Sequence, residues 1–381
     1  MGRVANWVSS RDEQDAQEFF QILMQTFQKV KKPHINPILS SLKNPPFHKG
    51  APIKNAEVFV ELKNPFIGLA ASKIACITCG YTASLSHYST DCISLPVPRK
   101  KNCTIYECLS SYTVIDQLDD FRCRKCILTN SISENNFLIN RLKAEIRDYQ
   151  KQINKLSNHS SSENMTDKIG SSDKLSDKLN RLIKLLNHSE STLENIIESN
   201  KKIEFALKND PELDLGDMCL SKKSTGLSTR QTMIARLPQL LCLHLNRSIY
   251  TNTGDVVKND CKISLDPILD MAPYLTTGYL DTRPLHPISS ISKTKDSASR
   301  INTDQQNSKF ELISIVSHLG SHNSGHYYTY KRIPYINPSD NSKSNKKYQW
   351  YRVSDSDFTP YDESSVFNVG NAFMLFYSRI E

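Results

Sequence analysis

The first feature with the residue types for chemistry is His326, near the C-terminal end of this 381-residue chain. It follows Gly325 and precedes a run of alternating aromatic residues. Glycine lacks a Cβ and allows another chain to approach closely, and the alternation predicts a half-buried strand that holds the imidazole in place. Ser354 and Asp355 follow on what we expect to be the neighbouring strand. This combination is typical of the general-base half of a nucleophilic site, although His326 could also be an ordinary packed or surface histidine.

The nucleophile of such a site is not evident in the sequence. Six of the ten cysteines lie outside the paired motifs described next, and none of them opens a helix after a loop rich in glycine and asparagine, where a thiolate would be favoured. We expect none of these six to be the nucleophile: Cys92, Cys103, Cys108, Cys219, Cys242 and Cys261. Among the other histidines, we expect His244 to pack in the core and His318 and His322 to face solvent.

The second feature is a pair of Cys-x-x-Cys motifs formed by Cys76, Cys79, Cys123 and Cys126. Each motif directs two sulfurs at one point, and two motifs complete a tetrahedral site with Zn–S bonds of about 2.3 Å. Four thiolates leave no open coordination position, so the predicted zinc is structural. The alternative is four unrelated buried cysteines.

Composition excludes several other classes of protein. Hydrophobic residues make up 38% of the chain and mean hydropathy is −0.47, so we expect part of the chain to contribute no core. The 48 basic and 40 acidic residues are spread without a dominant basic block, which argues against a nucleic-acid partner. The sequence contains neither an apolar run long enough to span a membrane nor the apolar segment of a signal peptide. We therefore expect reduced cysteines and no membrane segment.

Three regions follow from the patterning. Residues 1–136 begin with an amphipathic helix over 12–27, with Phe19, Ile22, Leu23 and Phe27 as its expected apolar stripe, and continue into strands around the cysteine pairs. Residues 137–227 form an insert with a 3-4 apolar repeat and polar slots at Ser189 and Asn200, which predicts a helical, coiled-coil hairpin or a disordered insert. Residues 228–381 return to strand patterns and contain the histidine region.

Taken together, these motifs resemble the ubiquitin-specific proteases. The resemblance covers about 6–135 and 228–381. It rests on the helix box from Gln14 to Phe19, the cysteine pairs, the strand from Leu237 to Arg247, and the histidine region ending in the strand 372–377. It implies an α+β, papain-like fold with fingers, a palm, an incomplete thumb and the helical insert. Within the family, Trp7 and the serine at 354 are most similar to the member of the mitochondrial outer membrane, which suggests that location.

The resemblance also implies roles for individual residues. His326 would be the general base, oriented by Ser354 or, failing that, by Asp355, and Asp15 and Glu18 would meet the arginines of the ubiquitin tail. A structural zinc, ubiquitin and ubiquitinated proteins are the implied cofactor and partners. For Asp15 and Glu18 the plain alternative is stabilising charge at a helix N-terminus.

One departure from the family is large. The family's nucleophilic cysteine lies in a segment before the helix box, and this sequence has almost nothing there. We therefore expect an N-terminally truncated form of a thiol-dependent deubiquitinase. Because the nucleophile is absent, we do not expect this chain alone to be reliably active. The alternative is a non-catalytic module that binds ubiquitin.

Overall fold

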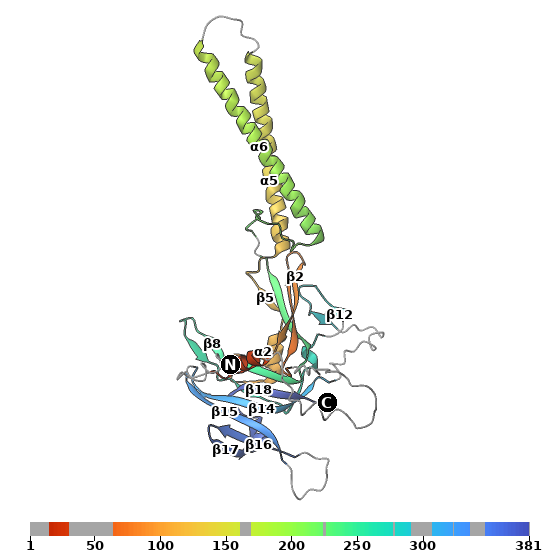
Figure 1. Ribbon diagram of the computed structural model, residues 1–381, viewed down its shortest axis with the longest axis vertical. Coiled ribbons are helices and arrows are strands. Elements are labelled where there is room, and N and C mark those ends of the chain that lie inside the picture. The colour runs from red at the N-terminus through yellow and green to blue at the C-terminus, as the bar shows by residue number, and fades with distance from the viewer. Residues whose placement is uncertain are drawn as a thin grey trace, which may run out of the picture.

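The computed structural model describes most of the chain: residues 15–29, 64–160, 169–223, 226–276, 279–290, 307–322, 324–335 and 347–380. It shows a mixed α+β protein in which a body of sheets and short helices carries a long helical hairpin (Figure 1). The predicted fold class is confirmed. Trp7 and Gln14, which contributed to the resemblance, lie outside the described residues.

The largest sheet has eight strands and carries the histidine region. Its order is β17-β16-β15-β14-β18-β7-β3, and β11 pairs with β14. The pairs are antiparallel except β3 with β7. The strands are β3 (Ile93–Pro96), β7 (Leu240–Asn246), β11 (Ile268–Asp270), β14 (Lys309–Gly320), β15 (Gly325–Tyr335), β16 (Lys347–Ser354), β17 (Asp357–Tyr361) and β18 (Ala372–Arg379).

The main hydrophobic core packs against this sheet. Trp350, Tyr377 and Phe310 are its largest fully buried apolar side chains. Helix α4 (Ile105–Thr113) buries Ile105 and Leu109 in the same core, and a capping box between Thr104 and Glu107 satisfies its first backbone N–H groups. The short elements beside this core are β4 (Asn102–Thr104), β10 (Lys262–Ser264), the 3₁₀ helix η2 (Ala272–Tyr274) and α8 (Glu363–Val366).

A four-stranded sheet in the order β2-β1-β6-β5 connects this body to the helical hairpin (Figure 1). Its strands are β1 (Gly68–Cys76), β2 (Thr82–Thr90), β5 (Asp116–Leu118) and β6 (Ser228–Arg236). Lys73 of β1 is buried, and its ammonium donates to the carbonyls of Asp281, Arg283 and His286. These bonds fix the loop between β12 (Tyr279–Leu280) and β13 (Ser289–Ser290) against the sheet.

The hairpin consists of α5 (Arg124–Ser160) and α6 (Ile169–Asn209), which pack against each other (Figure 1). Its first helix starts inside the second cysteine pair, so the boundary predicted between 136 and 137 falls within α5. The two polar slots, Ser189 and Asn200, are buried. Asn200 accepts from Asn135 at 2.8 Å and donates to Asn136 at 3.1 Å. The amide of Asn200 is therefore satisfied by hydrogen bonds across the hairpin, as a buried amide must be.

Helix α2 (Ala16–Lys29) buries a different face from the one predicted. Phe20 is buried against Phe66 and Phe376, with ring centroids 5.2 and 5.8 Å away. Leu23 and Phe27 of the expected stripe are exposed. The prediction was wrong because this short helix has apolar residues on several sides, so more than one of its faces could pack against the protein core. Contact with the sheet determines which face is buried.

None of the helices in the described ranges is both long and apolar enough to cross a membrane. One further element matters for the site: a two-stranded hairpin of β8 (Ser248–Tyr250) and β9 (Val256–Lys258), beside the ends of β14 and β15.

Candidate active site and cysteine cluster

His326 lies at the start of β15, and Ser354 ends the neighbouring strand β16. Antiparallel pairing of the two strands, with Thr329 opposite Val353, carries their ends to the same edge of the sheet. His326 Nε2 is 2.7 Å from Ser354 Oγ. If Nε2–H donates to the hydroxyl, Nδ1 keeps its lone pair and is the basic nitrogen of the ring.

Asp355 is farther from the ring than Ser354. Its Oδ2 is 3.5 Å from His326 Nε2, and its side chain is 80% exposed. Asp355 has a left-handed backbone, with φ of 49°, in the tight turn that joins β16 to β17. Aspartate tolerates this conformation better than most residues. The turn therefore leaves the carboxylate in solvent and the hydroxyl against the ring.

A cavity of about 520 Å³ lies beside His326. The charged and titratable residues of its wall include Asp15, Lys258, His318, His326 and Asp355. No cysteine of the described residues lines it. A base is thus presented to a space large enough for a narrow, extended chain.

The N-terminus of α2 forms one side of this cavity. Asp15 Oδ1 accepts hydrogen bonds from the backbone N–H groups of Gln17 and Glu18 at 2.8 and 3.0 Å, which makes Asp15 the N-cap of the helix. The Ala16 N–H donates to Tyr327 Oη at 3.4 Å, next to His326. Of the two predicted acidic residues, the structure brings Asp15 to the cavity but leaves Glu18 outside its lining. Gln17 lies there instead.

Three further histidines, His244, His318 and His322, belong to the cavity wall, and the sequence did not predict this position. Burial lowers the pKa of His244 to about 4, against the opposing effect of the Asp15 carboxylate. Its Nδ1 is 3.0 Å from Ser94 Oγ. His318, expected to face solvent, packs on Tyr327 with ring centroids 4.7 Å apart. His322 is exposed, as expected.

A buried guanidinium fixes the floor of the cavity. Arg247 is 4% exposed. It donates to four backbone carbonyls, those of Asn259, Cys261, Gly370 and Ala372, at 2.8–3.1 Å. Burial lowers its pKa, but arginine stays protonated at any physiological pH. An unpaired buried cation would be costly, so the folded protein keeps all four bonds. They connect the end of β7 to β18 and to the segment after β9.

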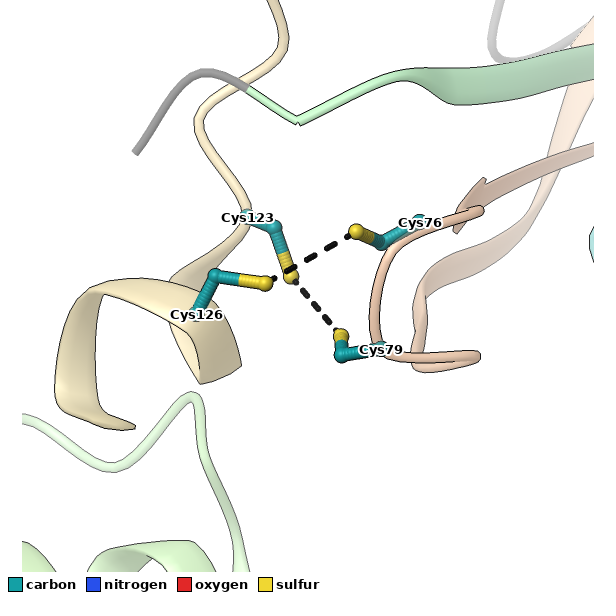
Figure 2. Close-up of side chains that lie close together, drawn as sticks. All are labelled: Cys76, Cys79, Cys123 and Cys126. Atoms are coloured by element: carbon teal, nitrogen blue, oxygen red, sulfur yellow. Dashed lines mark hydrogen bonds between the residues drawn. The ribbon is translucent and has the colours of Figure 1, made fainter. Parts of the chain in front are cut away.

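The four paired cysteines converge at the base of the helical hairpin (Figure 2). Cys76 and Cys79 come from the β1–β2 turn, and Cys123 and Cys126 from the start of α5. All four sulfurs lie within 4.8 Å of one another, with 3.8 Å from Cys76 to Cys126 and 3.6 Å from Cys79 to Cys123. A tetrahedral ion with Zn–S bonds of about 2.3 Å places its sulfurs about 3.8 Å apart. The residues therefore fit a structural metal.

The surroundings of Cys76 favour a thiolate. Burial by itself raises the pKa of this thiol, but hydrogen bonds from the backbone of Cys79 and Thr78 and from the Cys79 and Cys123 side chains outweigh it and lower the pKa to about 7. Gly80, with φ of 68°, permits the tight turn that aims these groups at the sulfur. Cys219, by contrast, is exposed and lies outside the cluster.

Comparison with known proteins gives a consistent result. A sequence model of the family "Ubiquitin carboxyl-terminal hydrolase" matches residues 1–377. Ubiquitin carboxyl-terminal hydrolase 16 of Emericella nidulans is 25% identical over 362 residues, 87% of this chain and 46% of its own length. Ubiquitin carboxyl-terminal hydrolase 30 of Xenopus tropicalis is 22% identical over 428 residues, all of this chain and 66% of its own length. The chain thus spans about half of the first relative and about two thirds of the second.

Solved structures match along most of the chain. The SAGA Ubp8/Sgf11/Sus1/Sgf73 DUB module bound to ubiquitin aldehyde is similar over 97% of this chain and 50% of its own, with 19% identity and a TM-score of 0.48.

Proposed function

This chain belongs to the ubiquitin carboxyl-terminal hydrolase family, and we propose that it supplies the general base and the ubiquitin-tail site of a cysteine-type deubiquitinase. The observation that carries the proposal is the hydrogen bond between His326 and Ser354 at the wall of the cavity. The reaction is hydrolysis of peptide and isopeptide bonds at the C-terminal glycine of ubiquitin.

The roles of the residues follow from the ring geometry. Ser354 occupies Nε2, so Nδ1 is the atom that takes the proton of the nucleophile. The thiolate adds to the carbonyl carbon, and the imidazolium returns its proton to the leaving amine. Water then hydrolyses the acyl-enzyme, with the same imidazole as base. Ser354 orients the ring, and Asp355, which is exposed, adds a weak electrostatic contribution.

We assign the rim of the cavity at Asp15 to the basic tail of ubiquitin. One carboxylate oxygen of Asp15 caps α2, and a basic side chain approaching from the cavity would contact the same group. Glu18 is more distant from this path and is a weaker candidate. The four cysteines would hold a zinc ion, whose role is to fix the β1–β2 turn to α5.

Two ubiquitin reagents test the proposal. Calorimetry should detect binding of ubiquitin to the chain and much weaker binding of ubiquitin that lacks its C-terminal Gly-Gly. Asp15→Asn should weaken the first, with Glu363→Gln, an exposed acid away from the cavity, as control. Equal binding of both ubiquitins would contradict the tail site.

A ubiquitin carrying a C-terminal electrophile separates catalysis from binding. Covalent labelling of a cysteine, located by mass spectrometry, would support the enzyme. Binding without labelling favours a non-catalytic ubiquitin-binding module, an alternative that gains weight because no described cysteine lines the cavity.

A further inference from the structure

Lys258, the last residue of β9, bridges two carbonyl groups at the end of β14. Its Nζ donates to His318 O at 2.8 Å and to Gly320 O at 2.9 Å. Both bonds have ordinary lengths for a charged donor. Lys258 also lines the cavity beside His326, so this bridge belongs to the wall of the candidate active site.

The backbone on both sides of Lys258 is fixed by contacts with neighbouring segments. β9 pairs with β8, which places Lys258 opposite Ser248. The next residue, Asn259, donates its backbone N–H to Arg247 O at 2.7 Å, and its carbonyl accepts from the Arg247 guanidinium at 2.9 Å. Burial and the nearby Arg247 charge both lower the pKa of Lys258. The ammonium is therefore placed by backbone contacts on both sides of it and is not a freely moving surface charge.

The two carbonyls that Lys258 holds belong to residues in contact with the backbone at His326. Leu319 pairs with His326, and Gly320 pairs with Gly325. A Cβ at position 325 would collide with His318 Nε2 and Leu319 O, so His318 lies directly against the backbone before His326. Gly320 has a backbone φ of 133°, a conformation that residues other than glycine rarely adopt. A shift in this strand end would be transmitted to the base.

We infer that Lys258 is a positioning residue for His326: by tying the His318 and Gly320 carbonyls together, it fixes the backbone that sets the imidazole against Ser354. This inference rests on the proposed role of His326 as the base. Lys258 acts through the turn and does not itself transfer a proton. Its removal would leave two carbonyls without their charged donor. The end of β14 would keep its pairing with β15 and the bond from His318 N–H to Asn371 O, but it would lose its contact with β9.

The test compares three variants at Lys258 with a control on β14, the strand whose carbonyls Lys258 contacts. Lys258→Met keeps the length but removes every donor, Lys258→Gln keeps a neutral donor, and Lys258→Arg keeps the cation. Lys309→Met, an exposed lysine at the opposite end of β14, is the control. The readouts are the nitrogen chemical shifts of the His326 ring, assigned with a His326→Gln variant, and the Kd for ubiquitin.

We expect the His326 shifts to move most in Lys258→Met, less in Lys258→Gln and least in Lys258→Arg, with Lys309→Met matching the wild type. The Kd for ubiquitin should rise about tenfold in Lys258→Met, in line with lost hydrogen bonds to a charged group. If Lys258→Met fails to fold, Lys258→Gln decides the question. Unchanged ring shifts in a folded Lys258→Gln or Lys258→Met would overturn the inference.

This outcome is separate from the fate of the proposed function. The ring measurement needs no ubiquitin, so it remains valid if the wild-type chain does not bind ubiquitin. Conversely, a wild-type chain that binds ubiquitin, with ring shifts that do not respond to Lys258, would sink the positioning role alone.

Discussion

The imidazole of His326 contacts the hydroxyl of Ser354 at 2.7 Å, although a carboxylate lies at the very next position. A hydroxyl is neutral, so it orients the ring but stabilises an imidazolium less than a carboxylate would. The base of this site is therefore set by geometry more than by charge.

Ser354→Ala should lower ubiquitin hydrolysis about tenfold or more, since the ring loses the hydrogen bond that fixes its tautomer. The measurement is kcat on a fluorogenic amide of ubiquitin, with the wild type assayed first to establish that activity. Asp355→Asn is the matched control and should change kcat less than about threefold, because an exposed charge contributes little. A larger effect of Asp355→Asn than of Ser354→Ala would reverse the assignment.

Removing metal from the cysteine cluster should destabilise the base of the hairpin. A structural zinc contributes on the order of 10 kcal/mol of folding free energy. The purified chain should contain one zinc per molecule by atomic absorption, and Cys126→Ser should lose the zinc and lower the melting temperature. Cys219→Ser, at an exposed position outside the cluster, should keep both. Full stability in Cys126→Ser without zinc would show that the cluster is an ordinary group of thiols.

Asn200→Ala should destabilise the hairpin by about 1–3 kcal/mol, because Asn135 and Asn136 lose their partner across the seam. Urea unfolding followed by far-ultraviolet circular dichroism measures this loss. Asn154→Ala, on an exposed face of α5, is the control and should change stability by less than about 0.5 kcal/mol. If the two variants unfold alike, the buried amides do not hold the seam.

Stability should fall in mild acid because of His244. Its folded pKa of about 4 lies below the ordinary value of 6.5, so between these values the unfolded chain binds a proton that the folded chain does not. The contribution is complete above about pH 6.5 and is lost as pH falls toward 4. Its upper limit is about 3 kcal/mol, at 1.36 kcal/mol for each pKa unit.

Urea titrations at pH 7.5 and pH 5 measure this loss for the wild type and for His244→Gln, which keeps a side-chain amide near Ser94. The variant should lose less stability between the two pH values. His322→Gln, at an exposed histidine, should behave as the wild type. An identical pH response in all three proteins would place the acid sensitivity elsewhere.

Local spacing explains what the sequence predicted well. Two residues separate the cysteines of each pair, so each motif turns both sulfurs to one side wherever the motif lies in the fold. The 3-4 repeat of the hairpin marks its seam, and Ser189 and Asn200 fall in that seam because helical periodicity alone places them there. The alternation of aromatic residues likewise predicted that His326 and Ser354 lie on adjacent strands, and the structure pairs these strands.

Other features depended on contacts between segments far apart in the chain. Packing against the sheet buries Phe20 of α2, whereas the helical pattern alone had favoured Phe19, Ile22, Leu23 and Phe27. The same docking brought Asp15 to the cavity and left Glu18 outside it.

Residue types and spacing alone were enough to predict a histidine with a hydroxyl and a carboxylate in reach, four cysteines in two pairs, and an insert, helical or disordered, between the second pair and the histidine region. That Ser354 rather than Asp355 faces the ring follows from the folded backbone, because the left-handed turn at Asp355 leaves the carboxylate in solvent. It also decided that Lys258 supports the strand end beside the base. Periodicity encodes neither result, since both depend on where distant backbone segments meet in space.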